Sequence, residues 1–163
     1  MLREFERDIK GDVSTYWTKR SNTYDVFPVP NSEEDERAAY CSVLKRFYNG
    51  NRLEILDVGT GTGFMALMLA EMGHKTTGLD ITEAMLDKAR QKANGNNQRI
   101  SFQVGDAENL PFDDASFDAI VSRYLIWTLP DPLRALREWL RVIRPGGTII
   151  CIEGQWKDDS LKG

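Results

Sequence analysis

From Arg52 onward the sequence repeats one pattern, a short apolar segment followed by a glycine or polar turn and, in most repeats, a helix. Five segments have the length and apolar character of buried strands: Leu53–Val58, Thr76–Asp80, Ile100–Val104, Phe117–Ser122 and Thr148–Ile152. Strands that alternate with helices form a parallel sheet covered on both faces. The third and fourth segments are separated by about the minimum length of a crossover.

Residues typical of helix starts and helix ends predict where helices lie between these strands. Phe64–Met72 is almost wholly apolar, and the next helix begins after Thr82, a good N-cap, and ends at Asn94–Gly95. A third helix runs from Pro132 to Ile143 and stops at Arg144–Gly147, where proline and glycine follow each other. The pattern therefore predicts an α/β protein.

The part before Arg52 has a different pattern. Apolar residues at helical spacing over residues 3–19 are interrupted by Gly11, and Thr18–Asn31 is typical of an irregular connection. Ser32 then predicts the start of an amphipathic helix that stops at Asn49–Gly50. We expect residues 1–50 to form an N-terminal helical cap segment, 51–156 the ligand-binding core and 157–163 a frayed tail, all in one compact domain.

Composition excludes several classes of function. The chain has 163 residues with 21 basic and 25 acidic side chains, a net charge of −4 that argues against binding nucleic acid through its phosphates. Its apolar runs are too short to span a bilayer, and it opens with no secretory leader, so we expect a cytoplasmic protein with no membrane partner. Cys41, Cys151 and the single His74 predict reduced thiols and no metal site.

Candidate ligand-binding residues follow the strands directly. In an open parallel sheet, ligands bind outside the carboxyl ends of the strands. The residues at those ends are Asp57, the turn from Gly59 to Gly63, Asp80, Asp106, Ser122, Arg123 and Glu153.

The glycine turn predicts a nucleotide-like ligand. Gly59, Gly61 and Gly63 allow a ligand to approach the main chain, and the following helix offers free N–H groups. Asp80 comes about 20 residues after the first strand, where a carboxylate can bind ribose hydroxyls. Gly61, Gly63 and Ala66 also satisfy the dinucleotide pattern, so an NAD-dependent oxidoreductase remains an alternative at this point.

Four segments resemble one family in order and spacing: Ile55–Gly63, Gly78–Ile81, Gly105–Phe112 and Leu140–Gly147. They are similar to the class I S-adenosylmethionine-dependent methyltransferases, most of all to the small-molecule branch that includes the ubiquinone-biosynthesis type (type 11). The resemblance covers roughly residues 14 to 153. It implies a doubly wound, Rossmann-like three-layer sandwich with five parallel strands in the order 3-2-1-4-5.

The resemblance also implies how S-adenosyl-L-methionine, or its product S-adenosyl-L-homocysteine, would be held. Asp80 would bind the ribose hydroxyls, and Ile81 would pack on the adenine. Asp106 and Ala107, with Glu108 beside them, would recognise the edge of the adenine ring. The methionine portion would lie near Asp57, near the turn residues Gly59, Thr60, Gly61 and Gly63, and near Ser122 and Arg123. Tyr16 and Tyr24 are similar to an N-terminal aromatic that closes over the cofactor.

The implied reaction is an in-line displacement that transfers a methyl group to a small-molecule acceptor. The sulfonium is already activated, so the protein mainly orients the acceptor. Candidate bases are Tyr16, Tyr124 and Glu153, and Tyr124–Trp127 could line an acceptor pocket. The position after strand four carries no Asp/Asn-Pro-Pro turn, so nucleic acid is not the expected substrate.

One departure from the family concerns the last strands. The family's sheet usually has seven strands, whereas this sequence ends soon after Thr148–Ile152, so we expect a form or fragment that lacks the last two. The expected consequences are a homodimer through this exposed strand, or a catalytically incomplete domain that binds S-adenosylmethionine without turnover.

Overall fold

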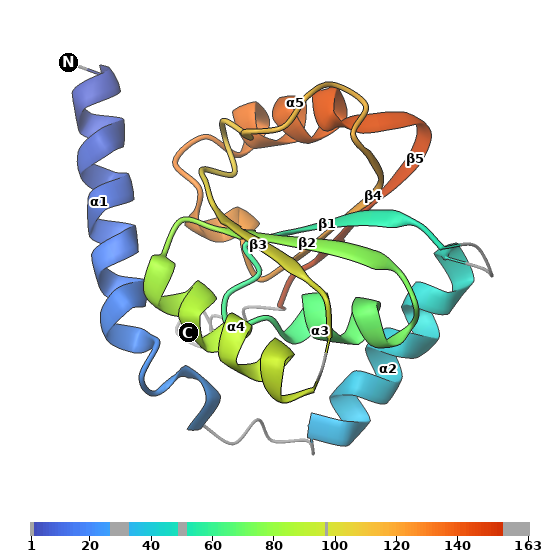
Figure 1. The fold of residues 1–163 in the computed structure, drawn as a ribbon. Helices are drawn as coiled ribbons and strands as arrows, with labels where there is room; N and C mark the ends of the chain where they lie inside the picture. Colours follow the sequence, from blue (N-terminus) through green and yellow to red (C-terminus); the bar gives the residue numbers. More distant parts are fainter. Residues whose placement is uncertain (1, 27–32, 49–51, 97, 155–163) are drawn as a thin grey trace, which may run out of the picture.

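A parallel sheet lies at the centre of the computed structural model, which describes residues 2–26, 33–48, 52–96 and 98–154 (Figure 1). Its strands are β1 (Glu54–Val58), β2 (Lys75–Asp80), β3 (Ser101–Val104), β4 (Phe117–Arg123) and β5 (Ile143–Ile152). All neighbours pair in parallel, in the order β3-β2-β1-β4-β5. The predicted fold class and strand order are confirmed.

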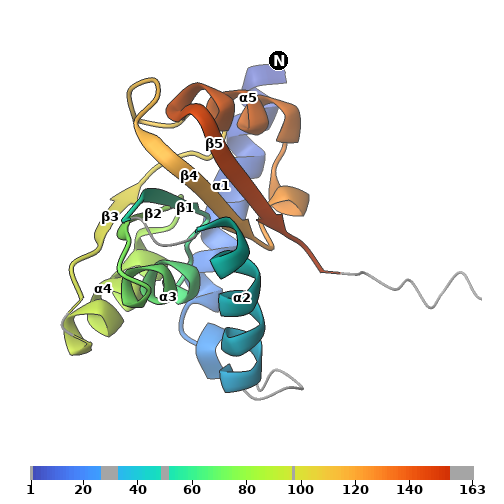
Figure 2. The same ribbon diagram turned by 90° about the vertical axis from the view of Figure 1, so that its right-hand side faces the viewer.

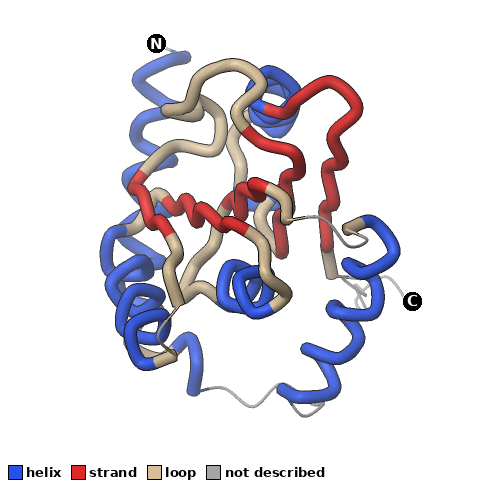
Figure 3. Tube along the Cα trace, turned by 45° about the vertical axis from the view of Figure 1, so that its right-hand side comes forward, coloured by secondary structure: helices blue, strands red, loops and turns tan. Residues whose placement is uncertain are grey.

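Helices cover both faces of this sheet (Figures 2 and 3). They are α1 (Leu2–Arg20), α2 (Glu33–Phe47), α3 (Phe64–Glu71), α4 (Glu83–Gly95) and α5 (Pro132–Val142), with short 3₁₀ turns at Tyr24–Val26 and Ile126–Thr128. α5 lies on one face and α2, α3 and α4 lie on the other, while α1 lies next to α4. Within the described residues, no helix is long and apolar enough to cross a membrane.

The alternation of side chains along β1 and β4 divides the core into two clusters. Leu56, Val58 and Ile120 face α5, whose Trp139 is fully buried among them. Ile55 and its neighbours on β4 face α2 and α3 instead. Apolar residues on both faces of a strand are expected when helices cover both sides of a sheet, so the core follows from the strand sequences.

Two local predictions were wrong. α1 continues through Gly11, where φ is not positive, because a single glycine inside a helix costs only about 1 kcal/mol. β5 begins at Ile143, a residue that we predicted from the sequence to belong to the preceding helix. The register shifts between Phe117, which pairs with Ile143, and Ala119, which pairs with Thr148, so the Arg144–Gly147 turn becomes an irregularity inside the strand, with Gly146 at φ +83°.

Some predictions have no test in this structure. Ser32, Asn49, Gly50 and the tail at 157–163 lie outside the described residues. Cys41 and Cys151 are free thiols, the second of them exposed. In the part of the sheet that the structure describes, β5 forms an edge, and its pairing with a second copy stays a prediction.

Candidate functional site

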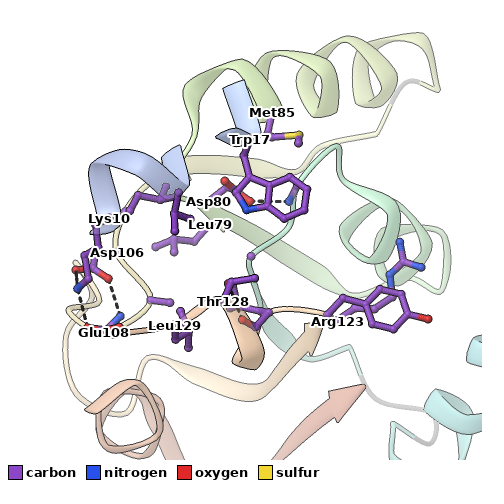
Figure 4. A pocket seen from close by; sticks show the side chains of 18 of the residues that line it. Lys10, Trp17, Leu79, Asp80, Met85, Asp106, Glu108, Arg123, Thr128 and Leu129 are labelled. Carbon is purple, nitrogen blue, oxygen red and sulfur yellow. Dashed lines mark hydrogen bonds and ion pairs between the residues drawn. The ribbon is translucent and has the colours of Figure 1, made fainter. Parts of the chain in front are cut away.

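A cavity of about 760 Å³, including the part open to solvent, lies at the carboxyl ends of the central strands (Figure 4). This is the edge where the topology predicts a ligand, because the chain crosses from β1 to both sides of the sheet. Ten of the predicted site residues line it: Tyr24, Gly59, Gly61, Asp80, Ile81, Asp106, Ala107, Glu108, Arg123 and Tyr124.

The other predicted residues lie elsewhere. Asp57, Thr60, Gly63 and Ser122 are buried beside the cavity but are not part of its lining. Tyr16 is 58% exposed and does not line the cavity. Glu153 is exposed, and its Oε1 accepts a hydrogen bond from the backbone N–H of Ile126 at 3.0 Å. Of the three candidate bases, Tyr124 alone faces the cavity.

The glycine turn after β1 is folded against the end of β2. The N–H groups of Gly59 and Thr60 donate to the carbonyl of Leu79, at 2.8 and 2.9 Å. Gly59 has φ +71°, and a Cβ there would come within 2.9 Å of Leu125. A Cβ on Gly61 would meet no atom within 4 Å, so this residue borders open space. The turn therefore leaves its main chain accessible to a ligand.

Asp80 is fixed between the turn and α4. Its Oδ2 accepts from Gly61 N–H and its Oδ1 from Thr82 N–H, both at 2.9 Å. The Thr82 side chain makes no capping hydrogen bond, so the predicted side-chain cap of α4 is not formed, and Asp80 binds the N–H of the N-cap residue itself. Burial raises the pKa of Asp80, and the backbone hydrogen bonds oppose that rise. Each oxygen keeps a further lone pair for a ligand hydroxyl.

Asp106 and Glu108 form an acidic corner at the end of β3. Asp106 Oδ1 accepts from the N–H of Glu108 at 2.9 Å. Lys10, on α1, places its Nζ 2.7 Å from Asp106 Oδ2 and 2.7 Å from Glu108 Oε2. Burial lowers the pKa of Lys10, but the hydrogen bonds to the two carboxylates outweigh it, and the net pKa is raised.

One face of α1 forms a wall of the cavity. Lys10, Val13 and Trp17 line it, at the i, i+3, i+7 spacing of a single helix face. Figure 4 shows Trp17 beside Asp80 and Met85, and its ring contacts Tyr24 edge to face with centroids 5.9 Å apart. Sequence reasoning did not identify Lys10 and Trp17, although their helical spacing is the signal that could have found them.

Arg123 and three aromatic rings form the opposite end. The guanidinium carbon lies 4.2 Å from the centroid of the Phe64 ring and 5.1 Å from that of Tyr124. The Tyr124 hydroxyl is 3.3 Å from that of Tyr40, which lies 3.1 Å from Glu36 Oε1. Burial, and then the hydrogen bond with Tyr124, raise the pKa of Tyr40. Tyr124 has φ +57°, a strained backbone that turns it toward the cavity.

Asp57 gives this end a buried negative charge. It is 1% exposed, its Oδ2 accepts from the Thr60 hydroxyl at 2.6 Å, and burial raises its pKa to about 6. Its Oδ1 has no hydrogen-bond partner among the described residues. Carboxylates at the ends of β1, β2 and β3 are acceptors that suit a ligand with hydroxyl and amino groups.

Comparison with known proteins identifies the family. Residues 56–151 match the sequence family described as "Methyltransferase domain". The chain belongs to this family. The matched segment contains β2, β3 and β4, most of β1 and β5, and every strand end that lines the cavity. The family resemblance inferred from the four segments is thereby confirmed.

Individual relatives agree with this assignment. The chain is 36% identical over 147 residues to a demethylmenaquinone methyltransferase of Staphylococcus epidermidis, covering 88% of this chain and 61% of the relative. It is 42% identical over 122 residues to the malonyl-acyl-carrier-protein O-methyltransferase of Erwinia pyrifoliae, covering 72% and 45% of the two chains. The chain thus spans less than two thirds of the length of these relatives.

A solved structure shows the same arrangement of elements. A SAM-dependent methyltransferase from Aquifex aeolicus superposes with a TM-score of 0.60 at 30% sequence identity, over 64% of this chain and 57% of that one. The likeness supports the assigned fold.

Proposed function

We propose that this chain binds S-adenosyl-L-methionine in the cavity and transfers its methyl group to a small-molecule acceptor by in-line displacement. One observation carries the proposal: the carboxylates of Asp80 and Asp106, at the ends of adjacent strands, line the same cavity as the open glycine turn. The family match supports this reading, because the matched segment is a methyltransferase domain.

Each wall of the cavity suits one part of that cofactor. Asp80 would accept from the ribose hydroxyls, and Ile81 and Met85 would pack on the base. Asp106 would accept from the adenine amino group. The methionine portion would lie along Gly59 and Gly61, where its ammonium gains from the buried charge of Asp57.

When bound, the cofactor supplies a methyl group on a sulfonium, an electrophile that needs no further activation. The protein's contribution is then orientation and exclusion of water. Trp17 and Leu125 are apolar walls that shield the cavity, while Arg123 and Tyr124 border the end left for the acceptor. For a hydroxyl acceptor, the chain from Tyr124 through Tyr40 to Glu36 offers a route for the released proton.

The binding proposal predicts a specific ligand preference. Isothermal titration of the protein with S-adenosylhomocysteine should give a dissociation constant of about 100 µM or tighter, within the range usual for enzyme ligands. NAD should give no measurable heat, because its pyrophosphate would lie against Asp80 and near the buried charge of Asp57. Binding of NAD in place of S-adenosylhomocysteine would overturn the proposal and favour an oxidoreductase.

The proton route predicts a rate effect without a binding effect. Tyr124→Phe should lower kcat for a hydroxyl acceptor by about 100-fold, the size of a lost general base, and leave the affinity for S-adenosylhomocysteine unchanged. The measurement is release of S-adenosylhomocysteine during turnover. Tyr16→Phe is the matched control, since Tyr16 is 58% exposed. Equal turnover by the wild type and Tyr124→Phe would exclude this route.

A further inference from the structure

Lys10 joins α1 to the two carboxylates that follow β3. Its Nζ lies 2.7 Å from an oxygen of Asp106 and 2.7 Å from an oxygen of Glu108, and the three side chains line the cavity together. The Lys10 side chain is 19% exposed, that of Asp106 30% and that of Glu108 0%. Removing one partner from such a partly shielded cluster costs more than removing one from a surface ion pair, because it leaves a poorly solvated charge unpaired.

Glu108 depends on this ammonium. Its Oε1 accepts from the backbone N–H of Asp131, the residue that caps α5, at 2.9 Å. Lys10 is the only cation that the described residues place within 4.0 Å of its Oε2. A fully buried carboxylate needs an opposite charge or hydrogen bonds beside it, because its desolvation is costly. Lys10 supplies that opposite charge to Glu108 at 2.7 Å.

Asp106 is fixed through the same contacts. Its Oδ1 accepts from the N–H of Glu108 and its Oδ2 accepts from Lys10, so the carboxylate cannot rotate without losing a bond. Each oxygen retains another lone pair, and the side chain is partly exposed to the cavity. The carboxylate thus presents a fixed acceptor to a ligand.

We propose that Lys10 is a positioning residue that orients Asp106 to accept the exocyclic amino group of adenine, so that α1 takes part in base selection. This inference rests on the proposed function, which assigns the adenine to this corner. Val13 and Trp17 lie on the same face of α1, so the helix that forms this wall of the cavity also carries the residue that fixes the base acceptor.

The test compares two ligands by isothermal titration: S-adenosylhomocysteine and its 6-deamino analogue, in which hydrogen replaces the amino group of the base. The wild type should prefer S-adenosylhomocysteine by about tenfold, the worth of one hydrogen bond to a charged group. Lys10→Met should reduce that preference to about twofold or less by weakening only S-adenosylhomocysteine, and Lys10→Arg should restore most of it. Lys45→Met, on the exposed side of α2, is the matched control.

The outcomes separate the inference from the proposed function. An equal loss for both ligands in Lys10→Met, or no loss for either, would overturn the inference and leave the binding of S-adenosylhomocysteine standing. A wild type that binds neither ligand would overturn the proposed function and the inference with it. If circular dichroism shows that Lys10→Met does not fold, Lys10→Gln replaces it in the same comparison. The wild type alone is also a test, because a wild type that binds both ligands equally well refutes the inference.

Discussion

Replacement of Asp80 by alanine should lower the affinity for S-adenosylhomocysteine by at least about 100-fold, because two hydrogen bonds from ribose hydroxyls to a carboxylate contribute about 1.5–3 kcal/mol each. The same change removes the acceptor for Gly61 N–H and Thr82 N–H. The glycine turn should therefore lose its anchor as well as its ligand contact. Isothermal titration measures the loss.

Two further variants identify its cause. Asp80→Asn keeps one side-chain oxygen as an acceptor, so it should hold the turn better than alanine and bind with intermediate affinity. Asp113→Ala removes an exposed aspartate away from the cavity and should bind as the wild type does. If Asp80→Ala bound S-adenosylhomocysteine within a factor of three of the wild type, the ribose assignment would have to be abandoned.

Trp139→Ala should lower the free energy of unfolding by about 4 kcal/mol, the usual cost of removing a large buried aromatic side chain. Trp139 is fully buried in the cluster between α5 and the sheet. Its Nε1 also donates to the carbonyl of Ala107 at 3.0 Å, which ties α5 to the loop that carries Asp106. Urea denaturation followed by circular dichroism measures the change.

Its neighbour on the same helix provides the control. Leu140 is 65% exposed, so Leu140→Ala should change stability by no more than about 0.5 kcal/mol. Trp139→Phe keeps most of the apolar contact but leaves the carbonyl of Ala107 without its donor, and should cost about 1–3 kcal/mol. A stability for Trp139→Ala equal to that of Leu140→Ala would contradict the packing of α5 described above.

The sheet and its ligand edge could be predicted because both depend on local sequence. The alternation of apolar segments and turns places Asp80 and Asp106 at strand ends whatever the distant contacts are, and both line the cavity. The glycine turn was predictable for the same reason, since few residues other than glycine adopt φ +71° and +55°.

The wall supplied by α1 could not be predicted in the same way. Which face of a helix meets the sheet depends on contacts far along the chain, such as that between Lys10 and Asp106. The sequence favoured Tyr16, whereas its neighbour Trp17 lines the cavity, because adjacent residues on a helix point about 100° apart. The register shift within the β4–β5 pairing also depends on tertiary contacts, since it lies between the Phe117–Ile143 pair and the Ala119–Thr148 pair.

The two ends of the cavity are built from different parts of the chain. Lys10 and Arg123 lie on opposite sides of it in Figure 4. The Lys10 end is held by α1 and the loop after β3, and the Arg123 end by α2, α3 and the turn after β4. Within the described residues, no hydrogen bond or ion pair joins Lys10 to Arg123. A substitution at one end of the cavity therefore leaves the direct contacts of the other end in place, so the two ends can be altered separately.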